Sequence, residues 1–175
     1  MILKLKRTPG IYLVGFMGSG KTTIGERLAD ELGWRFVDLD RDIEADQGVS
    51  IAELFDTRGE QEFRAIEAAA LSRRVKEIER GHATVMAVGG GAFVSPANAD
   101  LLCRHGVTVW LNCPFPVIVQ RTGRASHRPL ARDPERFAAL YIERQAAYQR
   151  AEHHIVIGSD DPQEAVQAIL RLPLF

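Results

Sequence analysis

The chain has 175 residues, of which 46% are hydrophobic and 26% charged, a composition that suits one domain, residues 1–175, with a sizeable core. Its formal net charge is -1, and no run of Lys or Arg is long enough to predict a nucleic-acid-binding surface. The sequence has neither a signal-peptide core nor a stretch that approaches the length of a membrane span. We therefore expect a soluble, cytoplasmic protein that binds neither nucleic acid nor a membrane. The two cysteines, Cys103 and Cys113, lack metal-binding spacing.

A glycine-rich sequence, GFMGSGKT, occupies residues 15–22. It follows an apolar run at 11–14 that predicts a buried strand, and it precedes apolar residues at helical spacing over 24–32. Strand, glycine-rich turn and helix form the context of a P-loop, whose backbone N–H groups point at phosphate oxygens. Lys21 can reach the phosphates of a nucleoside triphosphate, and the Thr22 hydroxyl can bind Mg²⁺. The residues predicted to contact the nucleotide here are Gly18, Ser19, Gly20, Lys21, Thr22 and Thr23.

Along the whole chain, strand and helix patterns alternate. The predicted strands span residues 11–14, 35–38, 83–88, 107–111 and 154–157. The predicted helices span residues 24–32, 42–47, 51–59, 61–80, 135–151 and 162–172, with shorter ones after Ser95 and before Arg121. The chain contains no internal repeat and no low-complexity linker. This pattern predicts an α/β fold, a three-layer α/β/α sandwich around a five-stranded parallel sheet.

Chemically useful residues follow the predicted strands. Asp38 and Asp40 stand at the end of the second strand, and a triple glycine at 89–91 follows the third. Because the carboxyl ends of parallel strands share the edge at which α/β proteins bind ligands, we expect these groups near the P-loop. The segment at about 122–134 is polar, basic and not periodic, which predicts a mobile functional loop.

A P-loop is compatible with a kinase, a molecular switch or a larger ATPase or motor. The chain length argues against the last class, and the Asn-Lys-x-Asp motif by which GTPases read their base is absent. No apolar strand ends in an acidic Walker-B residue. Aspartates near the phosphates and arginines on several elements instead suit phosphoryl transfer, which depends on positioning and charge neutralisation. The residues therefore favour a small-molecule kinase.

Several motifs resemble those of shikimate kinases in order and spacing, from about residue 11 to 157. They are the P-loop, Asp38-Leu39-Asp40, Gly59-Glu60-Gln61-Glu62-Phe63-Arg64, Gly89-Gly90-Gly91-Ala92, Arg121-Thr122-Gly123 and Arg128-Pro129-Leu130. The resemblance implies a nucleoside monophosphate kinase-like P-loop kinase fold with strand order 2-3-1-4-5. It also implies ATP- and Mg²⁺-dependent phosphorylation of the 3-hydroxyl of shikimate, in the pathway to chorismate and aromatic amino acids.

The same resemblance assigns an acceptor site. Arg64 and Arg144 are expected to bind the carboxylate of shikimate, since guanidinium groups present planar paired donors. Asp40 is expected to hold the hydroxyls and is a candidate to take the proton of the attacking one. Whether it is a general base stays open, because a loose transition state demands little deprotonation. The triple glycine lets the backbone approach substrate and phosphate closely.

The resemblance also assigns a nucleotide site. Asp38 is expected near Mg²⁺ beside Thr22. Arg128 lies in the loop that corresponds to the lid of the family, and it is expected to join Lys21 as a catalytic residue when the lid closes. Arg121 matches the residue that stacks on adenine.

Two further features of the sequence concern these two sites. The sequence GSDDP at 158–162 is acidic where members of the family often carry arginine, which puts one adenine contact in doubt. Glu67 follows Arg64 by one helical turn and is predicted to orient it through an i,i+3 contact.

Three alternative functions remain compatible with the sequence. A gluconate kinase of the same fold would also bind a carboxylate and hydroxyls. A ligand-sensing domain of this fold would keep binding but lose turnover, although Lys21, Asp40, Arg64 and Arg128 are all present here. A nucleoside monophosphate kinase would need a base-reading pocket and usually a longer chain. The resemblance favours a monomer.

Overall fold

The computed structural model describes residues 10–123 and 133–174, and its centre is a parallel sheet of five strands in the order β2-β3-β1-β4-β5. The strands are β1 (Gly10–Val14), β2 (Arg35–Asp38), β3 (Thr84–Ala87), β4 (Val107–Asn112) and β5 (His153–Val156). The predicted sheet and its strand order are confirmed, and each strand boundary lies within one residue of the predicted one.

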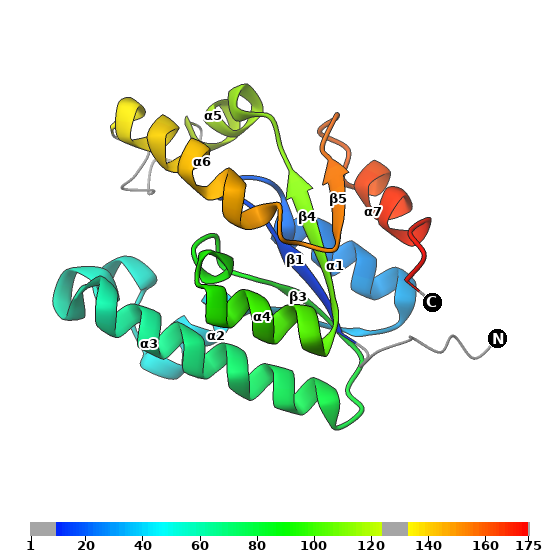
Figure 1. Ribbon diagram of the computed structural model, residues 1–175, viewed down its shortest axis with the longest axis horizontal. Coiled ribbons are helices and arrows are strands. Elements are labelled where there is room, and N and C mark those ends of the chain that lie inside the picture. Colours follow the sequence, from blue (N-terminus) through cyan, green and yellow to red (C-terminus); the bar gives the residue numbers. More distant parts are fainter. Residues whose placement is uncertain (1–9, 124–132, 175) are drawn as a thin grey trace.

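Helices cover both faces of this sheet, which confirms the three predicted layers (Figure 1). On one face α1 (Lys21–Leu32) packs beside α7 (Pro162–Leu170), and on the other α3 (Ile51–Glu79) packs beside α4 (Pro96–His105). The remaining helices are α2 (Leu39–Gln47), the 3-10 helix η1 (Ala92–Val94), α5 (Phe115–Gly123) and α6 (Pro134–Tyr148). Within residues 10–123 and 133–174, no helix has both the length and the apolar character that crossing a bilayer requires.

The inner strands form the middle of the hydrophobic core. Every residue of β1 and β3 is buried. Strands covered by helices on both faces have no solvent side, so their sequences are almost continuously apolar rather than alternating. The edge strands β2 and β5 differ, because Arg35 and Val156 are exposed. The P-loop that follows β1 is therefore anchored on the most deeply buried strand of the sheet.

Two helices begin earlier than predicted. Helix α1 begins at Lys21 rather than at residue 24, because Gly20 adopts φ 94 and serves as its N-cap. Helix α2 begins at Leu39 rather than at residue 42, because the Asp38 side chain caps it by accepting two backbone N–H groups of the first turn. Lys21 and Asp40 thus belong to the first turns of helices, where the backbone is regular and their positions are well defined.

Helix α3 is bent at Gly59, whose φ of 80 and ψ of 168 are not helical. The sequence predicted two helices with a break at this point, and the structure joins them across the bend. Glycine adopts a positive φ without the steric penalty that a Cβ would add. The bend separates the first turns of α3 from the straight part that carries the acceptor-site arginine of the prediction.

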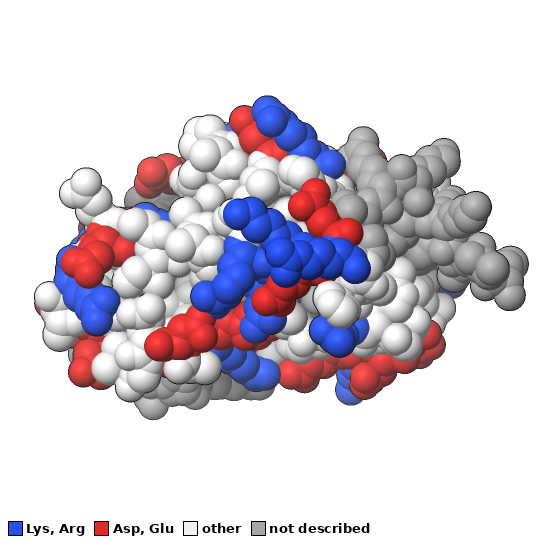
Figure 2. Space-filling view, turned by 90° about the horizontal axis from the view of Figure 1, so that it is seen from below, with Lys and Arg blue, Asp and Glu red and all other residues white. Residues whose placement is uncertain are grey.

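Ion pairs hold α2 against α3. Arg74 Nε donates to Asp42 Oδ2 at 2.5 Å, and Arg73 pairs with Asp46. Basic and acidic side chains accordingly lie next to one another on the face seen from below in Figure 2, the side on which α3 lies in Figure 1. These pairs connect the two helices that follow β2 and carry predicted acceptor-site residues.

Candidate active site

The P-loop wraps its lysine against its own backbone. Gly15, Gly18 and Gly20 have φ values of 147, 80 and 94, which glycine adopts without strain. Lys21 Nζ donates to the carbonyl oxygens of Gly15 at 2.8 Å and of Phe16 at 3.1 Å. The ammonium group is therefore held at the start of α1, where the helix N-terminus also favours anions.

The other predicted P-loop residues surround the same turn. Ser19 is fully buried, and its N–H donates to Phe16 O at 3.2 Å. Its hydroxyl Oγ has no hydrogen-bond partner among the described residues. Gly18 and Thr22 are half-buried, whereas Thr23 is exposed in the first turn of α1. The structure thus places all the predicted phosphate-contacting residues on one loop and one helical turn.

Thr22 and Asp38 meet next to the P-loop. Thr22 Oγ1 donates to Asp38 Oδ2 at 2.6 Å, while Asp38 Oδ1 accepts the N–H of Asp40 at 3.0 Å. Mg²⁺ at phosphate sites usually takes one or two protein oxygens and fills its shell with water and phosphate oxygens. A hydroxyl and a carboxylate in contact beside a phosphate-binding loop fit that requirement. The same contact fixes the Asp38 side chain as the cap of α2.

Asp40 lies at the base of the candidate site. Burial raises the pKa of Asp40 above the ordinary aspartate value, and the neighbouring Asp38 carboxylate raises it further, whereas nearby cations lower it. A Cβ at Gly89 would come 2.7 Å from Asp40 Oδ1, so the first residue of the triple glycine must be a glycine for the carboxylate to lie there. The segments that follow β2 and β3 therefore lie against each other, as expected for neighbouring parallel strands.

Arg64 is held by a buried carboxylate and two aromatic rings. Its Nη1 donates to Glu67 Oε1 at 2.8 Å, which confirms the predicted i,i+3 contact. Glu67 is 1% exposed, and burial raises the pKa of Glu67 while Arg64 opposes that shift. The guanidinium carbon lies 5.2 Å from the centre of the Phe63 ring and 5.8 Å from that of Phe55. The arginine is therefore oriented before any ligand binds.

The rest of the triple glycine lies between the two predicted carboxylate-binding arginines. A Cβ at Gly91 would overlap the guanidinium of Arg64, and a Cβ at Gly90 would come 3.4 Å from Arg144 Nη1. Arg144, on α6, also lies over the Phe16 ring at 5.8 Å. The structure thus brings Arg64, Arg144 and residues 89–91 together beside the P-loop, from elements far apart in the sequence.

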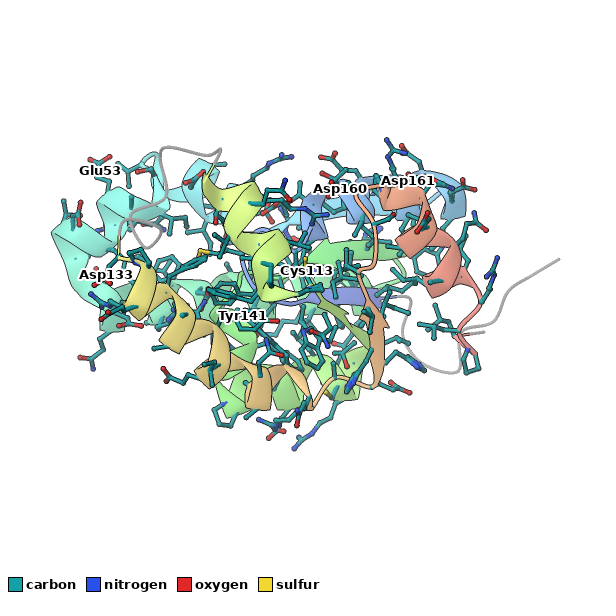
Figure 3. All side chains as sticks on the ribbon, turned by 90° about the horizontal axis from the view of Figure 1, so that it is seen from above. Glu53, Cys113, Asp133, Tyr141, Asp160 and Asp161 are labelled. Carbon is teal, nitrogen blue, oxygen red and sulfur yellow. The ribbon has the colours of Figure 1, made fainter. Side chains whose placement is uncertain are left out.

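Arg121 is anchored at the other side of the P-loop. Its Nη1 donates to Gly18 O at 3.1 Å, and its Nη2 pairs with Asp160 Oδ1 at 2.9 Å. Asp160 lies in the loop between β5 and α7, at the sheet edge that Figure 3 views from above. The acidic loop at 158–162 therefore has a specific partner, the arginine predicted to stack on adenine.

One predicted site residue lies outside the described part of the structure, and some contacts of the site were not predicted. Arg128 lies outside the described residues, as does most of the predicted lid. The sequence did not predict the contact of Phe16 with Arg144, or that of Asp160 with Arg121. Neither pair has a spacing that could reveal it, because each joins elements that are distant in the chain. In the sequence, only the acidic character of residues 158–162 distinguished this loop.

Known proteins resemble the chain over most of its length. The shikimate kinase family model matches residues 17–172. A shikimate kinase of Halorhodospira halophila is 46% identical over 154 residues, which are 86% of this chain and 85% of the relative. The shikimate kinase of Acinetobacter baumannii, solved in complex with shikimate, has a TM-score of 0.86 at 35% identity and covers 93% of this chain and 91% of its own. That of Aquifex aeolicus has a TM-score of 0.77 at 32% identity, covering 92% and 93%.

The P-loop at the end of the central strand, with carboxylates and arginines from five elements around it, defines the class of P-loop phosphotransferases. Within this class, the chain belongs to the shikimate kinase family.

Proposed function

We propose that the protein transfers the γ-phosphoryl group of ATP to the 3-hydroxyl of shikimate, yielding shikimate 3-phosphate for the pathway to chorismate and aromatic amino acids. The observation that carries this proposal is the convergence of Asp40, Arg64 and Arg144 with the triple glycine, directly beside the P-loop lysine. An acceptor with one carboxylate and several hydroxyls matches a site that offers guanidinium groups on one side and a carboxylate on the other.

On the acceptor side, Arg64 and Arg144 bind the shikimate carboxylate. Their guanidinium groups lie against Gly91 and Gly90 respectively, so that the glycine backbone offers N–H donors between them. Asp40 accepts hydrogen bonds from the hydroxyls of the substrate, which orients the attacking oxygen toward the phosphoryl group. Its raised pKa makes it a stronger proton acceptor than an ordinary aspartate, as a general base requires.

On the nucleotide side, the residues from Gly18 to Thr23 hold the phosphates, and Lys21 neutralises charge as the phosphoryl group moves. Arg121 stacks on the adenine, with Asp160 holding the other end of its guanidinium. Arg128, outside the described residues, completes the charge neutralisation from the lid. Because phosphoryl transfer needs little covalent participation by the protein, positioning and electrostatics supply the rate enhancement.

Thr22 and Asp38 would hold Mg²⁺. When bound, the ion neutralises the negative charge of the phosphate oxygens. The Asp38 carboxylate contributes by keeping the Thr22 hydroxyl in place, as their 2.6 Å contact indicates.

Replacing Asp38 with Asn is expected to raise the Mg²⁺ concentration for half-maximal activity about 10–100-fold, because a neutral amide supports the ion poorly. The measurement is a Mg²⁺ titration of the initial rate at saturating ATP and shikimate. Glu26→Gln, which removes an exposed carboxylate of α1 that pairs with Arg41, is the matched control and should leave the titration unchanged. An unaltered Mg²⁺ requirement in the Asp38 variant would show that this residue does not contribute to the metal site.

The proposed reaction is tested by coupled ADP release with ATP and Mg²⁺, comparing shikimate, gluconate, AMP and no acceptor. We expect ADP release above the background without acceptor only when shikimate is the acceptor. Turnover with gluconate would instead indicate a gluconate kinase of the same fold. ATP binding without turnover on any acceptor would favour a ligand-sensing domain.

We also propose that residues 1–175 form a single domain that acts as a monomer in the cytoplasm. The resemblance to the shikimate kinase family supports a monomer. Sedimentation at the concentration of the assay tests this assignment, and a stable dimer would contradict it.

A further inference from the structure

A buried tyrosine at the end of α6 has no part in the roles described so far. Tyr148 is 0% exposed, and its ring packs against Trp110 with 6.0 Å between the ring centres. Burial of a phenol is favourable for the ring but demands a partner for the hydroxyl. The identity of that partner links the tyrosine to the candidate active site.

The Tyr148 hydroxyl bonds to the triple glycine, which also borders one of the carboxylate-binding arginines. Its oxygen donates to the carbonyl of Gly90 at 2.5 Å. Arg144 lies one helical turn earlier on α6, and its guanidinium borders the same glycine, because a Cβ at Gly90 would come 3.4 Å from Arg144 Nη1. Burial raises the pKa of Tyr148 to about 12, so the hydroxyl keeps its proton at neutral pH and can donate. Gly90 therefore lies against both the Tyr148 hydroxyl and the Arg144 guanidinium.

The bond to Gly90 determines which way the next peptide N–H points. The described residues contain no cis peptide bonds, and in a trans peptide the C=O and N–H groups point in opposite directions. With the Gly90 carbonyl turned toward Tyr148, the N–H of Gly91 points away from it. Gly91 borders the guanidinium of Arg64, and its N–H has no backbone acceptor within the described part of the chain. This N–H is available to a ligand that Arg64 also binds.

We propose that Tyr148 is a positioning residue for the acceptor substrate: its hydroxyl holds the Gly90–Gly91 peptide, which borders the Arg144 guanidinium, in the one arrangement in which the peptide and the arginine both reach the substrate carboxylate. The proposal rests on the proposed function, since it names a support for that same site. Tyr148 acts through the groups it orients and does not touch the substrate itself.

The test replaces Tyr148 with Phe, which keeps the ring and removes the hydroxyl. The matched control is Tyr141→Phe on the same helix, because Tyr141 donates a comparable bond to the carbonyl of Cys113 at 2.9 Å (Figure 3). We expect the KM for shikimate to rise about tenfold in the Tyr148 variant, since a partly buried carbonyl is left unpaired and the Gly90–Gly91 peptide loses its support. The KM for ATP should stay within about twofold in both variants.

A Tyr148 variant whose KM for shikimate equals that of the Tyr141 variant would overturn the positioning role. So would an equal rise in the KM values for shikimate and ATP, because a general loss of structure affects both. Absence of shikimate-dependent turnover in the wild-type protein would instead overturn the proposed function, and this proposal with it. The melting temperatures of the two variants are expected to be similar.

A second measurement uses the unaltered protein and applies even if Tyr148→Phe does not fold. In ¹H–¹⁵N correlation spectra, the amide peak of Gly91 is expected to shift when shikimate is added, whereas ATP alone should move it little. A Gly91 peak that does not respond to saturating shikimate would show that its N–H is not a substrate donor. The orientation attributed to Tyr148 would then have no role in binding.

Discussion

Asp40→Asn is expected to lower kcat by about 10²–10⁴-fold, the range in which positioned acid–base groups contribute. Asn keeps the size of the side chain and its place in the first turn of α2, but it cannot take a proton and accepts hydrogen bonds more weakly. The measurement is steady-state ADP release at saturating ATP and shikimate. Asp46→Asn, which removes an exposed carboxylate from the same helix, should retain wild-type turnover.

The raised pKa of Asp40 also predicts the direction in which Asp40→Asn changes the stability of the fold. Because burial, and then the Asp38 carboxylate, raise the pKa of Asp40, the folded state binds this proton more tightly than the unfolded state does. The free energy of unfolding therefore falls as pH rises from the ordinary aspartate pKa through the raised one, and the penalty persists at neutral pH. Asp40→Asn removes it, so its Tm at pH 7 should equal or exceed that of the wild type. Full activity in this stable variant would refute the assignment of Asp40.

Arg64→Ala is expected to reduce kcat/KM for shikimate about 10²–10³-fold, because truncating one partner of a buried charged contact costs about 2–5 kcal/mol. The KM for ATP should change little, since the arginine lies on the acceptor side of the site. Arg64→Lys should recover only part of the loss, because an ammonium lacks the paired planar donors of a guanidinium. Arg58→Ala, which removes an exposed arginine paired with Glu62 on the same helix, is the control.

Arg64→Ala also leaves the carboxylate of Glu67 buried without its ion pair. The pKa of Glu67, already raised by burial, should then rise further, and the variant should lose stability as pH increases. Adding Glu67→Gln is expected to restore the Tm but not the binding of shikimate. Recovery of kcat/KM in the double variant would mean that Arg64 acts only as a partner for Glu67 and does not contact the substrate.

Most of the fold could be predicted because its signals are local. Nearly continuous apolar runs marked the inner strands β1, β3 and β4, since strands covered on both faces leave no polar side. The P-loop could be recognised for the same reason: its glycines, Lys21 and Thr22 are neighbours in the chain, so their spacing encodes the turn. The starts of α1 and α2 were missed because caps formed by Gly20 and Asp38 extend each helix beyond its periodic part.

The candidate site was predicted less completely, because its contacts join distant segments. Glu67 could be paired with Arg64 in advance only because helical geometry brings i and i+3 together. Asp160 could not be paired with Arg121, since 39 positions and a strand separate them. The sequence alone indicated only that the acidic loop puts one adenine contact in doubt.

By itself, then, the sequence determined the fold class, the strand order through its family resemblance, the phosphate-binding loop and the identity of the candidate residues. Tertiary structure alone decided which of these residues support one another. The bond between Tyr148 and Gly90 spans 58 positions, and no local pattern distinguishes this tyrosine from one that only fills the core. The physical reason is that local periodicity reports which face of an element is buried. The direction of a single hydroxyl is set instead by how separate elements pack together.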